Sequence, residues 1–293
     1  MSSNATNPIS ALPSVNIVFY GAGAMAEAIL RGLVEKEVAT PSRITVLNRS
    51  NAERLAELRE RYGIASASDD ADREAALAKA DVIVLAMKPK DAATALAALK
   101  PTLRREQLLV SLIAGLSIET MRQLTDAGQP IVRTMPNTSS TIGLGATGIS
   151  FSDAVTTSGR QLAQMMFDAI GMTTIVEERL LESVTAVSGS GPAYIYYMME
   201  AMVAAGVAQG LAPEAALELT VQTVRGAAEM VRQTGEAPAE LRRKVTSPNG
   251  STQAAIETLQ RHDFHGAVRQ AMDRCAARAA EMGQAIADEA LAR

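Results

Sequence analysis

The stretch that decides the fold is VNIVFYGAGAMAEAILRGL, residues 15–33. It begins with an apolar run, passes through two glycines and continues as a helix-like pattern without a break. The run predicts a buried strand and the following pattern predicts a helix. A Gly-x-Gly turn between a strand and a helix lets a pyrophosphate approach the backbone, where the helix N–H groups and dipole meet its negative charge.

The first glycine makes a tight turn, the second admits the phosphate, and the third position needs only a small residue, which is alanine here. The predicted phosphate-binding turn consists of Gly21, Ala22, Gly23, Ala24, Met25 and Ala26. An ordinary glycine-rich strand–helix turn is the alternative. The position between an apolar run and a helix favours dinucleotide binding.

The end of the second predicted strand indicates which dinucleotide binds. Asn48, Arg49 and Ser50 offer a cation and two polar groups, with no carboxylate to repel a ribose 2′-phosphate. Arginine suits bidentate contact with phosphate. We therefore expect NADPH rather than NADH, with NADH as a possible second cofactor and an ordinary surface role as the alternative for Arg49.

Short apolar runs alternate with helical stretches as far as about residue 176. This pattern predicts a Rossmann-like, doubly wound parallel sheet covered by helices on both faces. Ligands bind beyond the carboxyl ends of such strands. Two further strand ends should border the nicotinamide half, and they contain Ala86, Met87, Lys88, Pro89, Ile113, Ala114 and Gly115. For Lys88, a solvated loop lysine is favoured over a proton-transfer role.

Strand patterns end at about Glu177, and the remainder predicts only helices. We therefore expect a loose tail at 1–14, a dinucleotide-binding domain at 15–177 and an all-helical domain at 178–293. The segment Tyr194–Val207 is apolar nearly all round. Such a helix must be buried on every side, and a small helical domain has little interior, so we expect a second subunit to cover it.

The charge and the hydrophobicity of the sequence exclude some classes of binding partner. The net charge of −4 gives no broad cationic field for nucleic acid or an anionic membrane, and the longest apolar runs are too short to span a bilayer. We therefore expect a soluble cytoplasmic protein without either partner. Cys275 stands alone, which favours a packing role over a reactive thiol, and His262 and His265 lack the further ligands of a zinc site, so we expect no metal.

Three further motifs carry a resemblance: RTMPNTSSTIGLGAT (133–147), AVSGSGPAYIYYMMEA (186–201) and VTSPNGSTQAAIETLQ (245–260). Together with GAGAMAEAI, they resemble the pyrroline-5-carboxylate reductase family, in order and spacing, from about Asn16 to Met282. Two positions depart from the family's commonest pattern: Ser139 replaces a proline and Asn249 replaces a glycine. Because Asn tolerates positive φ, the turn at Asn249 is expected to survive.

The resemblance implies an activity and an assembly. The activity is hydride transfer from NADPH to C5 of 1-pyrroline-5-carboxylate, which gives L-proline in the last step of proline biosynthesis. The assembly is a homodimer interlocked through the C-terminal helices, and the family often forms five such dimers. The substrate pocket would lie between the cofactor and helices of both subunits. The cyclic imine is basic enough to be protonated, so orientation and electrostatics should dominate catalysis.

The resemblance also assigns substrate residues. Thr252 would hydrogen-bond the imine nitrogen, and the turn of Ser247, Asn249, Gly250 and Ser251 would offer N–H groups to the substrate carboxylate. Ser190 is a further substrate candidate. The alternatives are ordinary helix N-caps, at Thr252 and at the Ser188, Ser190 and Gly191 group.

Three other functions remain open at this stage. The chain could reduce a related cyclic imine acid with a larger ring, or it could be a non-catalytic NADP-sensing regulatory protein. A methyltransferase that binds adenosylmethionine is disfavoured by Arg49, which stands where the ribose of that cofactor would want a carboxylate.

Overall fold

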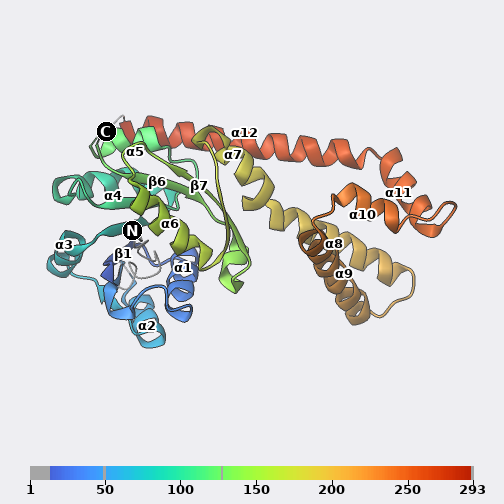
Figure 1. Ribbon diagram of the computed structural model, residues 1–293, viewed down its shortest axis with the longest axis horizontal. Coiled ribbons are helices and arrows are strands. Elements are labelled where there is room, and N and C mark those ends of the chain that lie inside the picture. Colours follow the sequence, from blue (N-terminus) through green and yellow to red (C-terminus); the bar gives the residue numbers. More distant parts are fainter. Residues whose placement is uncertain (1–13, 49–50, 127, 292–293) are drawn as a thin grey trace, which may run out of the picture. The chain divides into compact units, whose positions relative to one another are not determined.

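The computed structural model describes residues 14–48, 51–126 and 128–291 (Figure 1). The predicted tail, apart from Ser14, lies outside these ranges, as do Arg49 and Ser50. The chain folds into two compact units. One, the sheet unit, comprises residues up to 190 together with residues from 275 onward, and the other, the helical unit, is Gly191–Arg274.

These units differ from the predicted division after residue 177, since residues 178–190 and 275–291 belong to the same unit as the sheet. The predicted assignment of 178–293 to dimerisation is a separate matter and stays a proposal.

An eight-stranded sheet forms the centre of the sheet unit. Its strands are β1 (Ile17–Tyr20), β2 (Ile44–Leu47), β3 (Ala65–Ala67), β4 (Val82–Leu85), β5 (Leu108–Ser111), β6 (Ile131–Met135), β7 (Gly145–Phe151) and β8 (Gly171–Ile175). The order is β3-β2-β1-β4-β5-β6-β7-β8, and every neighbouring pair is parallel except β6–β7. The predicted Rossmann-like, parallel-dominated sheet is confirmed.

Helices cover both faces of this sheet. They are α1 (Ala24–Glu35), α2 (Ala52–Tyr62), α3 (Asp70–Lys79), α4 (Ala92–Leu99), α5 (Ile118–Leu124), α6 (Thr157–Asp168) and α7 (Leu181–Val184). Along β1, Ile17 and Phe19 join one core cluster with α1, α2 and α6, whereas Val18 joins another with α4 and α5. This alternation follows from the two-residue period of a strand, and it explains why the strands are apolar throughout.

Two features of the sheet escaped the sequence prediction. Strand β3 carries the small residues Ala65, Ser66 and Ala67 at a sheet edge, so it lacks an apolar run. The β6–β7 pair is antiparallel because residues 136–144, which form a turn with the short 3₁₀ helix Thr138–Ile142, are too few for a parallel crossover.

The helical unit contains α8 (Gly191–Ala208), α9 (Pro213–Thr234), α10 (Pro238–Lys244) and α11 (Ser251–Arg261). Helix α12 (Phe264–Leu291) begins in it and ends in the sheet unit. The prediction of helices throughout this part of the chain is confirmed. Helix α9 starts with Pro213 and ends at Gly235, which adopts a φ of +67° as a left-handed cap.

No residue of α8 is buried within this single chain. Its large apolar side chains are open to solvent instead, and Tyr197 is 76% exposed. A solvated apolar helix of this kind is typical of a subunit interface. Within the described residues, no helix combines the length and the apolar character needed to cross a membrane.

Candidate active site

The glycine-rich turn joins the ends of three strands. The Gly21 N–H donates to the Leu47 carbonyl of β2 at 3.0 Å. Gly21 has a φ of +128°, and a Cβ placed there would lie 2.4 Å from the Ala86 carbonyl oxygen, just after β4. Only glycine satisfies both the left-handed backbone and the close approach. The first glycine therefore holds the turn against the neighbouring strand.

The second glycine faces open space. Gly23 has a φ of −75° and a ψ of 173°, which any residue adopts, and no heavy atom of the described residues lies within 4 Å of its notional Cβ. It is the N-cap of α1, and among the described residues no side chain caps that helix end. Ala26, one turn further on, is buried. An uncapped helix N-terminus beside empty space is what a dinucleotide pyrophosphate requires, so these residues fit that group.

The other predicted strand ends lie at the same edge of the sheet. The Ala86 N–H donates to the Tyr20 carbonyl at 3.0 Å, and the Leu112 N–H donates to the Leu85 carbonyl at 3.0 Å, so β1, β4 and β5 end together. Met87 and Pro89 are half-buried at this edge, and Lys88 is exposed.

The loop after β5 is fastened by the C-terminal helix. Ile113 is buried and Ala114 is half-buried. Gly115 has a φ of +81°, and its notional Cβ would lie 2.9 Å from the Cα of Gly283 in α12. The two backbones therefore cross in contact, which only a glycine pair permits.

The loop after β2 is described only at its two ends. The Asn48 Oδ1 accepts a hydrogen bond from the Asn51 N–H at 3.1 Å. Asn51 caps α2, since its Oδ1 accepts from the Arg54 N–H at 2.9 Å. The predicted phosphate ligands Arg49 and Ser50 fall between these residues and lie outside the described chain.

A charged cluster that the sequence did not reveal lies beside the turn. Arg54 of α2 forms ion pairs with Glu27 of α1 and with Glu57, the latter at 2.7 Å. Glu27 also accepts hydrogen bonds from Tyr62 at 2.9 Å and from Arg61 at 3.1 Å. A contact between residues 27 places apart in the chain leaves no local pattern in a sequence.

These contacts shift the pKa values of Glu27, Tyr62 and Arg54, and that of Arg54 is raised by its hydrogen bonds to Glu57 and Glu27. Burial acts to raise the pKa of Glu27, but the hydrogen bonds from Arg54 and Tyr62 and the arginine charges outweigh burial and lower it. Burial and the hydrogen bond to Glu27 raise the pKa of Tyr62. Both shifts favour an ionised Glu27 and a neutral Tyr62 at neutral pH.

The serine-rich motif before α8 forms a π-helix, Thr185–Gly189. The Asn137 side chain connects it to the sheet, because its Nδ2 donates to the Ser188 carbonyl at 3.0 Å and its Oδ1 accepts from the Ala146 N–H at 3.2 Å. The notional Cβ of Gly189 would lie 2.6 Å from Met135 at the end of β6. This motif therefore lies at the same carboxyl edge of the sheet as the dinucleotide turn. Single π-helical turns of this kind are frequent at functional sites.

Two serine side chains of this motif form hydrogen bonds of their own. The Ser188 hydroxyl donates to the Val184 carbonyl, four residues back in the chain, at 3.1 Å. The Cys275 thiol donates to the Ser190 hydroxyl at 3.3 Å, which accounts for the single cysteine as a packing residue.

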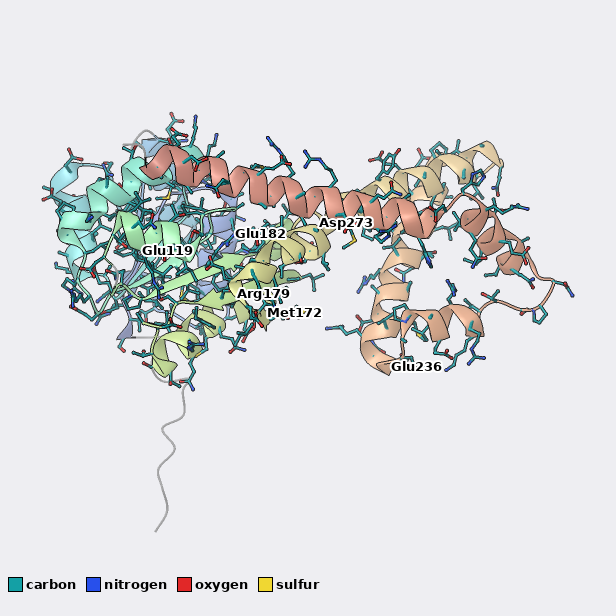
Figure 2. All side chains as sticks on the ribbon, turned by 90° about the horizontal axis from the view of Figure 1, so that it is seen from above. Glu119, Met172, Arg179, Glu182, Glu236 and Asp273 are labelled. Carbon is teal, nitrogen blue, oxygen red and sulfur yellow. The ribbon has the colours of Figure 1, made fainter. Side chains whose placement is uncertain are left out.

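An arginine inside the sheet anchors the segment that leads to this motif. Arg133 of β6 has a side chain only 8% exposed, and it forms ion pairs with Glu178 at 3.0 Å and with Glu182 at 2.8 Å. Glu182, labelled in Figure 2, lies on α7. Glu178 also accepts from the Ile118 N–H at 2.7 Å. The buried arginine is thus paired with two carboxylates, and it connects β6 with α7 and with the residues just before α7.

The second predicted site is a turn in the helical unit. Asn249 adopts a φ of +58°, so asparagine reproduces here the left-handed position expected of it. Gly250 is the N-cap of α11, without any side-chain capping bond, and Thr252 is the second residue of the helix. The alternative that Thr252 is an N-cap is therefore wrong. Its half-buried hydroxyl makes no hydrogen bond with any residue that the structure describes.

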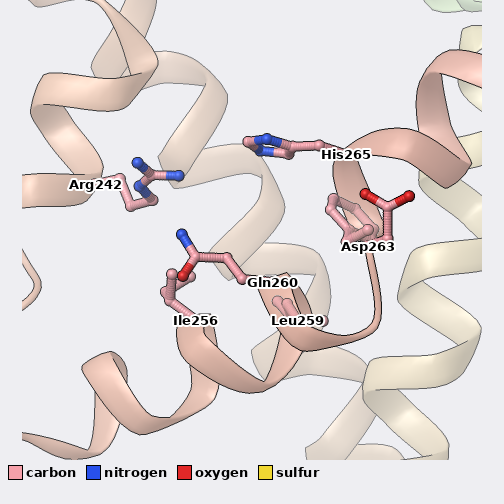
Figure 3. A pocket seen from close by; sticks show the side chains of 7 residues that line it. Arg242, Ile256, Leu259, Gln260, Asp263 and His265 are labelled. Carbon is pink, nitrogen blue, oxygen red and sulfur yellow. The ribbon is translucent and has the colours of Figure 1, made fainter.

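A pocket of about 290 Å³ also lies in the helical unit (Figure 3). It is lined by Arg242, Ile256, Leu259, Gln260, Asp263, Phe264 and His265. Asp263, in the turn before α12, accepts a hydrogen bond from the Gly266 N–H at 3.2 Å. Across the described ranges, no three His, Cys, Asp or Glu side chains gather as a metal site would require.

Comparison with known proteins identifies the family. The family model for pyrroline-5-carboxylate reductase dimerisation matches residues 178–282, and the model for the coenzyme F420-dependent NADP oxidoreductase matches residues 16–115. Pyrroline-5-carboxylate reductase 2 of Bacillus subtilis (strain 168) is 40% identical, over 94% of this chain and 98% of that protein.

Solved structures agree with this match. A pyrroline-5-carboxylate reductase from Coxiella burnetii has a TM-score of 0.86 at 36% identity, covering 92% of this chain and 98% of that one. The Plasmodium falciparum pyrroline carboxylate reductase, solved with NADP bound, has a TM-score of 0.82 at 26% identity, covering 93% and 99%. A chain with this fold, this dinucleotide turn and these relatives along almost its whole length belongs to the pyrroline-5-carboxylate reductase family.

Proposed function

We propose that this protein reduces 1-pyrroline-5-carboxylate to L-proline with NADPH, by hydride transfer to the imine carbon, in the last step of proline biosynthesis. The observation that carries the proposal is the N-terminus of α1 at Gly23, which no described side chain caps, in a chain that matches a reductase of this name over 94% of its length. We further propose that it acts in the cytoplasm.

The sheet unit supplies the residues for the cofactor. The turn from Gly21 to Ala26 would hold the pyrophosphate, because the first N–H groups of α1 are uncapped there. Asn48, Arg49 and Ser50 would hold the 2′-phosphate. The ends of β4 and β5, at 86–89 and 113–115, would border the nicotinamide ring, which supplies the hydride when bound.

The turn before α11 supplies the residues for the substrate. Within the turn, the Asn249 N–H donates to Gln253 Oε1 at 2.8 Å and the Gly250 N–H donates to the Ser247 carbonyl at 3.0 Å. The N–H groups of Ser251 and Thr252, in the first turn of α11, would therefore hold the carboxylate. The Thr252 hydroxyl would accept a hydrogen bond from the protonated imine nitrogen and so fix which carbon faces the cofactor. We propose that the Ser190 hydroxyl, which accepts from Cys275, offers its own proton to the substrate.

The protein needs no strong acid for this reaction, because the protonated imine is already electrophilic. The residues assigned above bind and orient, and orientation together with electrostatic complementarity accounts for rate enhancements of this kind. Lys88 is exposed and is given no proton-transfer role.

The direct test follows the absorbance of reduced nicotinamide in a mixture of purified protein, NADPH and 1-pyrroline-5-carboxylate. We expect absorbance to fall with substrate-dependent kinetics. Tight NADPH binding without turnover would instead favour a regulatory protein. A higher kcat/KM on the six-membered cyclic imine acid would move the assignment to the larger ring.

The cofactor preference has its own test. Replacing Arg49 by aspartate should weaken NADPH binding by about 100-fold and leave NADH within a few-fold, because a charge-assisted pair becomes a repulsion only where a 2′-phosphate is present. Dissociation constants from titration calorimetry measure both. Arg59→Asp, on the exposed face of α2, is the matched control. Equal losses for the two cofactors would refute the phosphate role.

The family model matched at 178–282 indicates that the chain self-associates. We propose a homodimer through the C-terminal helices, in which the exposed apolar side chains of α8 are covered by the second subunit, and an assembly of five such dimers. Fully solvated, an 18-residue helix of this composition would be an aggregation site.

A further inference from the structure

The dinucleotide turn is held by one side chain of the next helix. The Arg54 Nε–H donates to the Ala22 carbonyl at 3.3 Å, while the two terminal nitrogens of the same guanidinium engage Glu27 and Glu57. Only 20% of the Arg54 side chain is exposed. The Arg54 guanidinium therefore connects three segments: α1, α2 and the turn between β1 and α1.

This contact sets the direction of a peptide plane. The Ala22 carbonyl and the Gly23 N–H belong to one planar trans peptide, so the two groups point in opposite directions. Because the carbonyl points to Arg54, the Gly23 N–H points away from it. Among the residues that the structure describes, no atom lies within 4 Å of the notional Cβ of Gly23, so there is open space beside this peptide. Arg54 therefore holds the peptide that a phosphate would contact.

The same side chain has a second, electrostatic effect. Glu27 lies in the first turn of α1, where its charge stabilises the helix but repels an anion at the helix N-terminus. Arg54 and Arg61 both pair with Glu27, the latter at 3.1 Å, and Tyr62 donates to it at 2.9 Å. The pKa of Glu27 is lowered, so its carboxylate stays ionised and stabilises the N-terminus of α1. The two arginine charges neutralise this carboxylate, so it would not repel the cofactor phosphates at the same helix end.

We propose that Arg54 is a positioning residue for the cofactor pyrophosphate, which holds the Ala22–Gly23 peptide with its N–H outward and balances the charge of Glu27. The inference rests on the proposed function, because it presumes a dinucleotide at this turn. Arg54 acts through the peptide and not by touching the cofactor.

This role predicts a pattern that other roles do not. The pyrophosphate is common to NADPH and NADH, so loss of Arg54 should weaken both by the same factor. Loss of a 2′-phosphate ligand would weaken NADPH alone. Uniform binding of cofactor in ground and transition states also predicts a raised KM for NADPH with kcat nearly unchanged.

The experiment measures dissociation constants of NADPH and NADH by titration calorimetry for wild type, Arg54→Met, Arg54→Lys and Arg59→Met, with thermal unfolding of each. Arg59 is an exposed arginine of the same helix and serves as the matched control. We expect Arg54→Met to raise both constants roughly five- to tenfold and to raise KM for NADPH without a matching loss of kcat. Arg59→Met should leave both constants unchanged.

Arg54→Lys keeps the charge but replaces the planar fork by a single ammonium, so we expect about a threefold loss for both cofactors. If the methionine variant fails to fold, the lysine variant carries the test alone. A selective loss of NADPH, or unchanged constants in a folded variant, would overturn the role of Arg54. A wild-type protein that binds neither cofactor would overturn the proposed function instead, so the two failures are distinguishable.

Discussion

Gly23→Val should give a folded protein that binds NADPH more than about 100-fold more weakly than wild type. The backbone of Gly23 is extended, and its notional Cβ meets no atom of the described residues within 4 Å, so this part of the fold has room for the side chain. The cofactor would have no room, because the valine methyl groups would occupy the space of the pyrophosphate. A pyrophosphate held away from the turn would lose charge-assisted hydrogen bonds from the backbone N–H groups, each worth roughly 1.5–3 kcal/mol, which accounts for a factor of this size.

Gly21→Val is the contrasting variant. At that position a side chain would lie 2.4 Å from the Ala86 carbonyl and would need a φ of +128°. We therefore expect Gly21→Val to lower the thermal unfolding temperature strongly, whereas Gly23→Val should change it little. Calorimetric titration with NADPH, together with thermal unfolding, separates the two. NADPH binding by Gly23→Val within twofold of wild type would place the pyrophosphate elsewhere.

Thr252→Ala should lower kcat/KM for 1-pyrroline-5-carboxylate by about 10- to 100-fold while NADPH affinity stays the same. The reason is the loss of a hydrogen bond to a charged nitrogen, which is worth roughly 1.5–3 kcal/mol. The cofactor residues lie in the sheet unit and Thr252 lies in the helical unit, so the substitution removes no cofactor contact. Because the Thr252 side chain does not cap α11, its removal should leave the helix and the oligomer intact.

Thr258→Ala provides the matched control for this variant. Thr258 lies on the same helix and is exposed. Its hydroxyl donates to the Ala254 carbonyl at 2.9 Å and accepts from the Arg261 guanidinium at 2.9 Å, both within α11. Thr258→Ala should retain wild-type kcat/KM, and Thr252→Ser should recover much of the activity because it restores the hydroxyl. Steady-state kinetics and size-exclusion chromatography of the three variants decide the matter. An alanine variant with wild-type kcat/KM would remove Thr252 from the mechanism.

Sequence patterns were sufficient to predict an element where all the residues that determine it are close together in the chain. The strand, turn and helix of residues 15–33 were predicted because an apolar run, two glycines and a helical period are adjacent in the chain. The same is true of α9, which starts at Pro213 and ends at Gly235. Asn249 belongs to this group, since its tolerance of positive φ depends on its own side chain.

Other features were missed because they have no local signal. Strand β3 has small residues and is a strand only because β2 pairs with it. The direction of β7 depends on the short connection after β6. The π-helix at Thr185–Gly189 is tied to the sheet by Asn137, which lies 51 residues from Ser188.

By itself, the sequence determined the fold class, the family and the dinucleotide turn, because strand and helix periods and the glycine spacing are properties of consecutive residues. The tertiary structure alone decided that Arg54 reaches Ala22 and Glu27, that Gly115 meets Gly283, and that Gly250, not Thr252, caps α11. Long-range contacts and helix-end geometry arise only when separate elements pack, since the energy of such a contact depends on both partners and on the path of the chain between them.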